Sequence, residues 1–161
     1  MPAFFVGAEK EAAAARLGVG IADVSFLRKF EAREPQAGSW KLGSKRYLIV
    51  GEPPIENPSG GLDVTGVYSA FRLIGPQSRD VLRKVTSLNV SDHSLANGSC
   101  GQANLAHVHA ILLRDDLGPQ LSFIVLISRE YGESTWESIL HAGEEFHIVA
   151  MGVEALELLR R

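Results

Sequence analysis

The sequence has a single cysteine, Cys100, so it cannot form an internal disulfide. A chain without disulfides fits a reducing compartment, and we expect a cytoplasmic protein. No apolar run is long enough to cross a bilayer, and the first residues lack the basic and long apolar segments of a signal peptide. Lys and Arg total 16 against 19 Asp and Glu, so the sequence also lacks the basic surplus that nucleic-acid binding requires.

The remaining composition is that of a folded globular protein. Hydrophobic residues make up 45% of the 161 positions and charged residues 22%, which is enough apolar material for a core. A chain of this length forms one good core or two small lobes. We predict a single domain over residues 1–161, with lobes at about 1–60 and 61–161. The segment 51–61, which contains Pro53, Pro54 and Pro58, is the predicted linker between them.

Residues 62–90 are the most informative segment, because they predict a strand, a turn and a helix in one unit. Phe71 and Leu73 alternate with other residues as in a strand, and Gly75-Pro76 then ends the strand. From residue 77 to 85 the apolar spacing changes from two to about 3.6, which indicates a helix.

Patterns elsewhere predict an α+β fold with mainly antiparallel sheets, since the strands are joined by tight turns. Gly18 is expected to end the first helix in the left-handed conformation. The predicted helices cover residues 9–17, 128–146 and 152–160, the predicted strands cover 28–33, 105–113 and 120–128, a hairpin joins 40–42 to 47–50, and 87–99 is predicted to be irregular. The residues predicted to be mostly buried are Phe71, Leu73, Val81, Leu82, Ile124, Leu126, Trp136 and Leu140.

Two short segments echo each other: Asp23-Val24-Ser25 and Asp63-Val64-Thr65. They suggest two related halves, although the repeat is short enough for chance or ordinary strand chemistry to produce it.

Candidate chemical groups are few. His107 and His109 would lie on one face of a strand and could bind zinc, but no third ligand has a suitable spacing, so ordinary surface histidines are favoured. Asp115 and Asp116 could act in acid–base chemistry or bind a cation, but adjacent acids before Gly-Pro are typical of solvated turns. The sequence therefore predicts no metal site and no catalytic residue.

Three further motifs are assigned structural roles. Gly18-Val19-Gly20 lacks the third glycine and the preceding strand of a dinucleotide fingerprint. Cys100 has no Lys, Arg or His close in sequence that would lower its pKa. Ser128-Arg129-Glu130 is predicted to be the beginning of a helix.

Several stretches, in their order along the chain, resemble the family of the glycine-cleavage T-protein, an aminomethyltransferase; they are residues 63–65, 71–76, 78–82 and 136–146. Within that family the gamma subunit of heterotetrameric sarcosine oxidase is the most similar, through residues 42–50 and 98–102. The tail, 151–160, is similar to the segment that closes the folate-binding region in T-protein-like domains.

The resemblance implies an α+β fold of two small ferredoxin-like lobes around a central site that holds tetrahydrofolate in the catalytic members. It also exposes two departures. The family's GGxxDD-like hairpin, with its essential aspartate, is missing after residue 37, and residues 114–118 replace a YTGE-like turn. The resemblance therefore transfers no catalytic or cofactor-binding residue to this chain.

The resemblance implies a non-catalytic, T-protein-like subunit of an enzyme assembly in folate-linked one-carbon or methylated-amine metabolism. Any flavin would then be carried by a partner chain, a flavoprotein oxidase or dehydrogenase, because this sequence has no dinucleotide fingerprint. A minimal tetrahydrofolate-dependent aminomethyltransferase is the alternative, and a stand-alone folate-binding module is the third reading.

Overall fold

A computed structural model of the chain describes residue 3 and residues 5–161. Its α-helices are α1 (Ala8–Leu17), α2 (Ser78–Val85), α3 (Gly132–Gly143) and α4 (Val153–Arg160), and η1 (Arg129–Tyr131) and η2 (Glu144–Phe146) are 3-10 helices. The strands are β1 (Gly20–Asp23), β2 (Arg28–Ala32), β3 (Trp40–Gly43), β4 (Arg46–Gly51), β5 (Leu62–Asp63), β6 (Tyr68–Ile74), β7 (Cys100–Leu105), β8 (Val108–Arg114), β9 (Ser122–Ser128) and β10 (Val149–Met151). None of the helices in this described part is long and apolar enough to span a bilayer.

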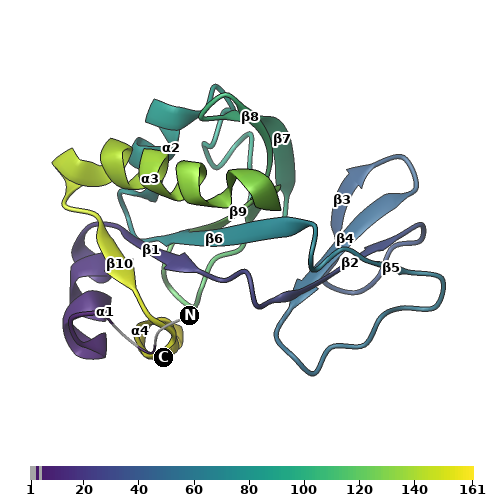
Figure 1. The fold of residues 1–161 in the computed structure, drawn as a ribbon, viewed down its shortest axis with the longest axis horizontal. Helices are drawn as coiled ribbons and strands as arrows, with labels where there is room; N and C mark the ends of the chain where they lie inside the picture. The colour runs from purple at the N-terminus through teal and green to yellow at the C-terminus, as the bar shows by residue number, and fades with distance from the viewer. Residues whose placement is uncertain (1–2, 4) are drawn as a thin grey trace.

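A six-stranded sheet in the order β10-β1-β6-β9-β8-β7 forms the centre of the molecule (Figure 1). Every pairing in it is antiparallel except the parallel pair of β1 and β10. In β9, every residue from Ser122 to Ile127 is buried, as its continuous apolar run predicts for a strand covered on both faces. The α+β class and the mainly antiparallel pairing are therefore confirmed.

Helices cover both faces of this sheet. One core cluster joins α2 and α3 to one face through Val81, Leu82 and Ile139, and another joins α1 and α4 to the opposite face through Ala15 and Leu156. Six of the eight predicted core residues are buried, the exceptions being Trp136 and Leu140.

Trp136 and Leu140 are half-buried because they lie at the edge of the face that α3 turns toward the sheet, although both pack against the core cluster of that face. The side chains at the centre of this face are those of Thr135, Ile139 and Ala142. The Trp136 ring still packs edge-on against Phe71, with 5.3 Å between the ring centroids.

The second sheet has four strands in the order β3-β4-β2-β5 and projects to one side of the helices (Figure 1). Its β3–β4 hairpin was predicted, and the two-residue turn places Lys45 at a positive φ of 51°. The predicted linker, residues 51–61, instead connects β4 to β5 within this sheet, and its Ile55 packs against Phe30, Ala32 and Ile49.

The chain passes between the two sheets twice, once from β1 to β2 and once from β5 to β6. The crossings are the two echoing segments, and each begins with an Asp side chain accepting a hydrogen bond from the N–H two residues later, at Ser25 and Thr65 (2.9 Å each). Because β1 precedes residue 60 but belongs to the larger sheet, the sheets do not follow the predicted lobe boundary. Strands β1 to β4 precede the boundary and strands β5 to β10 follow it, and the two sets are not arranged in the same strand order, so the two halves are not structural repeats of each other.

Several local features differ from the predictions. The predicted strand 105–113 is interrupted by a turn at Ala106 and His107, both at positive φ, so its first residue belongs to β7. Gly18 has a φ of −137° and is not left-handed. Gly75, which directly follows β6, does have a positive φ of 115°, and a side chain there would meet the carbonyl oxygen of Ala15 at 2.2 Å. Gly75 therefore allows the end of β6 to lie directly against the end of α1.

Candidate functional site

The connection between β8 and β9 carries the two candidate acids of the sequence, Asp115 and Asp116. Its backbone is closed by hydrogen bonds from Asp115 N to Ser122 O and between Leu117 and Gln120 in both directions, all 3.0 Å long. The turn is thus a firmly closed hairpin end that fixes the two aspartates Asp115 and Asp116.

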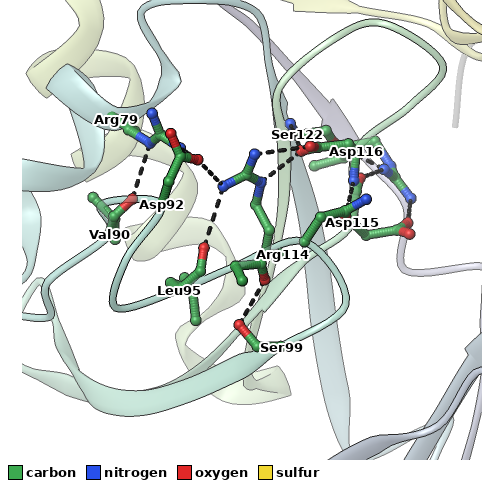
Figure 2. Close-up of polar contacts among 12 residues, drawn as sticks. Arg79, Val90, Asp92, Leu95, Ser99, Arg114, Asp115, Asp116 and Ser122 are labelled. Atoms are coloured by element: carbon green, nitrogen blue, oxygen red, sulfur yellow. Dashed lines mark hydrogen bonds and ion pairs between the residues drawn. The ribbon is translucent and has the colours of Figure 1, made fainter.

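Asp116 is held by Arg114, whose side chain is almost fully buried (Figure 2). The guanidinium donates two hydrogen bonds to the Asp116 carboxylate, at 2.6 and 2.8 Å, and others to Asp92 Oδ1 at 2.9 Å and Leu95 O at 3.2 Å. Arg79 also pairs with Asp92. The paired charges therefore fasten the irregular segment 87–99 to the β8–β9 turn.

These contacts keep the carboxylates ionised. Burial raises the pKa of Asp116, but hydrogen bonds from Arg114 and from the Ser122 N–H outweigh burial, and the net pKa is lowered. Hydrogen bonds from Arg114 and Arg79 likewise lower the pKa of Asp92. A general acid at neutral pH needs a raised pKa, so neither carboxylate suits that role.

Asp115 pairs with a second buried arginine, Arg72 of β6. Arg72 Nη2 lies 2.6 Å from Asp115 Oδ2, and Nη1 donates to Ser122 Oγ at 2.8 Å and to Asp115 O at 2.9 Å. The Arg72 side chain is 7% exposed. Since a buried guanidinium requires a partner, Asp115 has a structural role in stabilising it.

The prediction of solvated turn residues is therefore wrong in part. Asp115 and Asp116 do lie in a turn, but their side chains are 36% and 22% exposed and neutralise buried arginines. The arginines were missed because nothing local in the sequence separates a buried strand arginine from an exposed one.

A half-open cavity of about 240 Å³ adjoins this turn, between the two sheets and α4. Leu27, Ile124 and Leu156 contribute apolar walls, and Arg72 and Asp115 contribute polar ones. At its rim Arg160 pairs with Glu52 and Glu157. Pockets for drug-sized ligands typically measure about 300–1,000 Å³, so this cavity suits only a smaller molecule.

The histidines do not form the strand-face pair considered from the sequence. His107 lies in the β7–β8 turn at a φ of 72°, His109 lies on β8, and both are exposed. Within residue 3 and residues 5–161, no group of three or more His, Cys, Asp or Glu side chains could hold a metal ion.

The remaining motifs have structural roles. Gly20 lies in β1, where a side chain would meet Met151 Sδ at 2.0 Å. Burial raises the pKa of Cys100, and its thiol donates to Lys41 O at 3.0 Å, between β7 and β3. Ser128 precedes the 3-10 helix η1 without a side-chain cap, and the α-helix begins only at Gly132.

Comparison with protein families places this geometry in a known group. The family model of the GCVT N-terminal domain matches residues 61–161. The chain belongs to this family. The resemblance to the T-protein is thereby confirmed, and the matched region contains β6, β8, β9 and the β8–β9 turn.

Individual relatives agree with the family. Sarcosine oxidase subunit alpha from Corynebacterium sp. (strain P-1) is 32% identical over 99 residues, which are 60% of this chain and 10% of the relative. The chain thus spans about a tenth of the length of this curated relative.

Two solved structures share the fold. A heterotetrameric sarcosine oxidase from Corynebacterium sp. U-96 matches with a TM-score of 0.68 and 20% identity, over 86% of this chain and 92% of the matched chain. The glycine cleavage system aminomethyltransferase T from Bartonella henselae matches with a TM-score of 0.75 and 14% identity, over 96% of this chain and 54% of that one. The T-protein-like fold is therefore confirmed.

Proposed function

We propose that this chain is a non-catalytic, T-protein-like subunit of an enzyme assembly that acts on methylated amines, in the manner of sarcosine oxidase. The observation that carries the proposal is the commitment of Asp115 and Asp116 to the buried arginines Arg72 and Arg114. A turn whose acids are neutralised internally has no carboxylate left for a substrate or a pterin ring.

The size of the cavity supports the same conclusion. Tetrahydrofolate joins a pterin to an aminobenzoylglutamate tail, and about 240 Å³ is too small to enclose both parts. We expect weak or absent tetrahydrofolate binding and no turnover by the chain alone.

The proposed partners are other subunits, including a flavoprotein oxidase or dehydrogenase that carries out the amine oxidation. The match to a chain of a heterotetrameric sarcosine oxidase, over 92% of that chain, supports a subunit like its gamma subunit. A cytoplasmic location and a place in one-carbon metabolism are parts of the same proposal.

Co-purification from the native source tests the subunit role. The tagged chain is expected to elute with a flavin-containing protein in a constant ratio, and mass spectrometry identifies the chains while the absorbance spectrum identifies the flavin. Elution of the chain alone, at native expression levels and low salt, would contradict the proposal.

Titration calorimetry tests whether the purified chain binds tetrahydrofolate, and an aminomethyl-transfer assay tests whether it is catalytic. We expect no heat of binding at micromolar ligand, with a catalytic T-protein as the positive control. Micromolar binding, or transfer of an aminomethyl or methyl group by the chain alone, would instead favour the minimal aminomethyltransferase.

A further inference from the structure

A groove of about 460 Å³ lies on the face of the large sheet opposite the cavity. Phe71 and Arg72 are neighbours in β6, so their side chains point to opposite faces, Phe71 into the groove and Arg72 into the cavity. We call this second site the Arg129 groove; its lining includes Phe5, Asp23, Ser69, Arg129, Glu133 and Trp136, with Phe71 beneath.

The local structure holds the Arg129 groove open beside the start of α3. Gly132 lies so close to Ser69 that a side chain there would meet Ser69 Oγ at 2.5 Å. The Arg129 N–H donates to Val67 O at 2.9 Å, which fixes η1 against the beginning of β6. A smaller hollow of about 250 Å³, lined by Thr65 and Tyr68, shares Ser69 and Arg129 with it and continues the groove toward the crossing segments.

The side chains of the Arg129 groove are of the kinds that dominate protein interfaces. Trp136 is half-buried and rests edge-on against the almost fully buried Phe71, and the 52% exposed Phe5 also lines the groove, so Trp136 and Phe5 supply its aromatic surface. Exposed apolar side chains follow nearby in sequence, Val67 at 50% and Tyr131 at 44% exposure. Trp, Tyr and Arg are the residue types enriched at binding hot spots, where they surround a desolvated pocket.

The charged side chains Arg129 and Glu133 of the groove have no ion-pair partner among the described residues, unlike the charged side chains of the β8–β9 turn. Arg129 and Glu133 are exposed, and neither side chain has a hydrogen bond or ion pair with any residue in the described part of the chain. Arg72 and Arg114, in contrast, are both saturated by aspartates. An arginine and a glutamate four residues apart, beside an aromatic wall, present a positive, an apolar and a negative element together.

We infer that the Arg129 groove is a docking site for a loop of a partner protein in the assembly. The loop inserts one large apolar side chain against Trp136 and Phe5, an acidic residue on one side of it pairs with Arg129, and a basic residue on the other side pairs with Glu133. This complementary arrangement of charges would fix the orientation of the partner loop in the groove and speed its association. The inference rests on the proposed function, because it requires a partner subunit.

Binding of the co-purified partner to charge-reversal variants tests the inference. Arg129→Glu and Glu133→Arg are each expected to weaken binding at least tenfold, measured as Kd by surface plasmon resonance with the identified partner. Arg33→Glu is the matched control, since Arg33 is also exposed and has no ion pair among the described residues; it should change Kd less than twofold. Unfolding midpoints of Arg129→Glu and Arg33→Glu should stay close to that of the wild type, because these side chains have no hydrogen bond or ion pair to lose among the described residues. Glu133→Arg should lower the midpoint slightly, since it places a positive charge in the first turn of α3.

Hydrogen exchange of the complex gives a second, independent readout, with protection expected at residues 65–71 and 129–136. Wild-type affinity in both charge-reversal variants, or protection confined to other segments, would overturn the inference while leaving the proposed function intact. Failure of the wild-type chain to bind any subunit would contradict both the docking site and the proposed function. Self-association that is lost in Arg129→Glu would mean that a second copy occupies the groove, which also overturns the inference.

Discussion

The hydroxyl of Thr65 bridges the backbone of Lys29, accepting a hydrogen bond from Lys29 N at 2.9 Å and donating one to Lys29 O at 3.3 Å. Ser25 makes the equivalent pair with Ala70, at 3.0 and 3.4 Å. Each crossing segment therefore uses one hydroxyl to hold the strand that follows the other crossing. The echo in the sequence corresponds to a shared hydrogen-bond pattern at the two places where the chain changes sheet.

Replacing Thr65 by Val should destabilise the protein, because the near-isosteric side chain leaves the Lys29 N–H without its partner. The free energy of unfolding is expected to fall by about 1–3 kcal/mol in urea denaturation. Thr65→Ser keeps the hydroxyl and should retain most of the stability. Equal midpoints for Thr65→Val and the wild type would show that the bridge contributes nothing.

Lys29 predicts an unusual dependence of stability on pH. Burial lowers its pKa from 10.5 to about 8, while the charges of Asp23 and Asp63 act in the opposite direction, and Nζ donates to Ser25 O and Leu27 O. Between pH 8 and 10.5 the unfolded chain binds more protons at this residue than the folded chain, so this residue makes the free energy of unfolding rise with pH. Between pH 7.5 and 9.5 the rise should be on the order of 2 kcal/mol, since about 1.5 pH units of this range lie above the folded pKa and one pKa unit corresponds to about 1.4 kcal/mol.

The measurement compares the wild type with Lys29→Met by urea denaturation at several pH values from 7.5 to 9.5. The comparison is needed because Cys100 and Tyr68 have raised pKa values and act in the opposite direction. Lys29→Met also removes the hydrogen bonds to Ser25 O and Leu27 O, which changes the stability at every pH. The test is therefore the slope of the free energy of unfolding against pH. Parallel pH profiles for the two proteins would exclude the titration of Lys29.

Arg114→Met should be among the most destabilising single changes in the β8–β9 region. It leaves the partly buried Asp116 carboxylate without its bidentate partner, and breaking such a pair costs about 3 kcal/mol or more. Arg83→Met is the control, since the exposed Arg83–Asp80 pair should contribute less than about 1 kcal/mol. Thermal or urea unfolding measures both, and similar small losses would mean that Arg114 is not a structural anchor.

Phe71→Ala should lower the free energy of unfolding by about 3 kcal/mol or more, because the ring is 4% exposed and its removal leaves a cavity beside Trp136. Phe71→Leu fills part of the space and should cost less. Tryptophan fluorescence in a Trp40→Phe background, which leaves Trp136 as the one fluorescent tryptophan of the sequence, reports the same contact during unfolding. A midpoint unchanged in Phe71→Ala would show that the neighbouring side chains refill the site.

Local patterns in the sequence predicted the parts of the fold that local interactions determine. The β6–α2 unit and the β3–β4 hairpin were predicted because their turns and periodicities lie within a few residues. Strands β1 and β10 were missed, since they pair with each other from opposite ends of the chain. Strand β7 pairs with the neighbouring β8 and was missed because its sequence, CGQANL, lacks the apolar alternation of a strand. The role of Asp115 was missed because its partner Arg72 lies 43 residues earlier.

Because the chain passes twice between the sheets, a single break in the backbone between the two passages divides the strands of both sheets between two fragments. A break within the loop that joins β4 to β5 would leave β1 in one fragment and its antiparallel neighbour β6 in the other, while β5 would be separated from β2. Each fragment would hold strands of both sheets and a complete version of neither. The two pieces should therefore be unstructured when separate and regain the fold only when mixed, as complementing fragments of one cooperative unit.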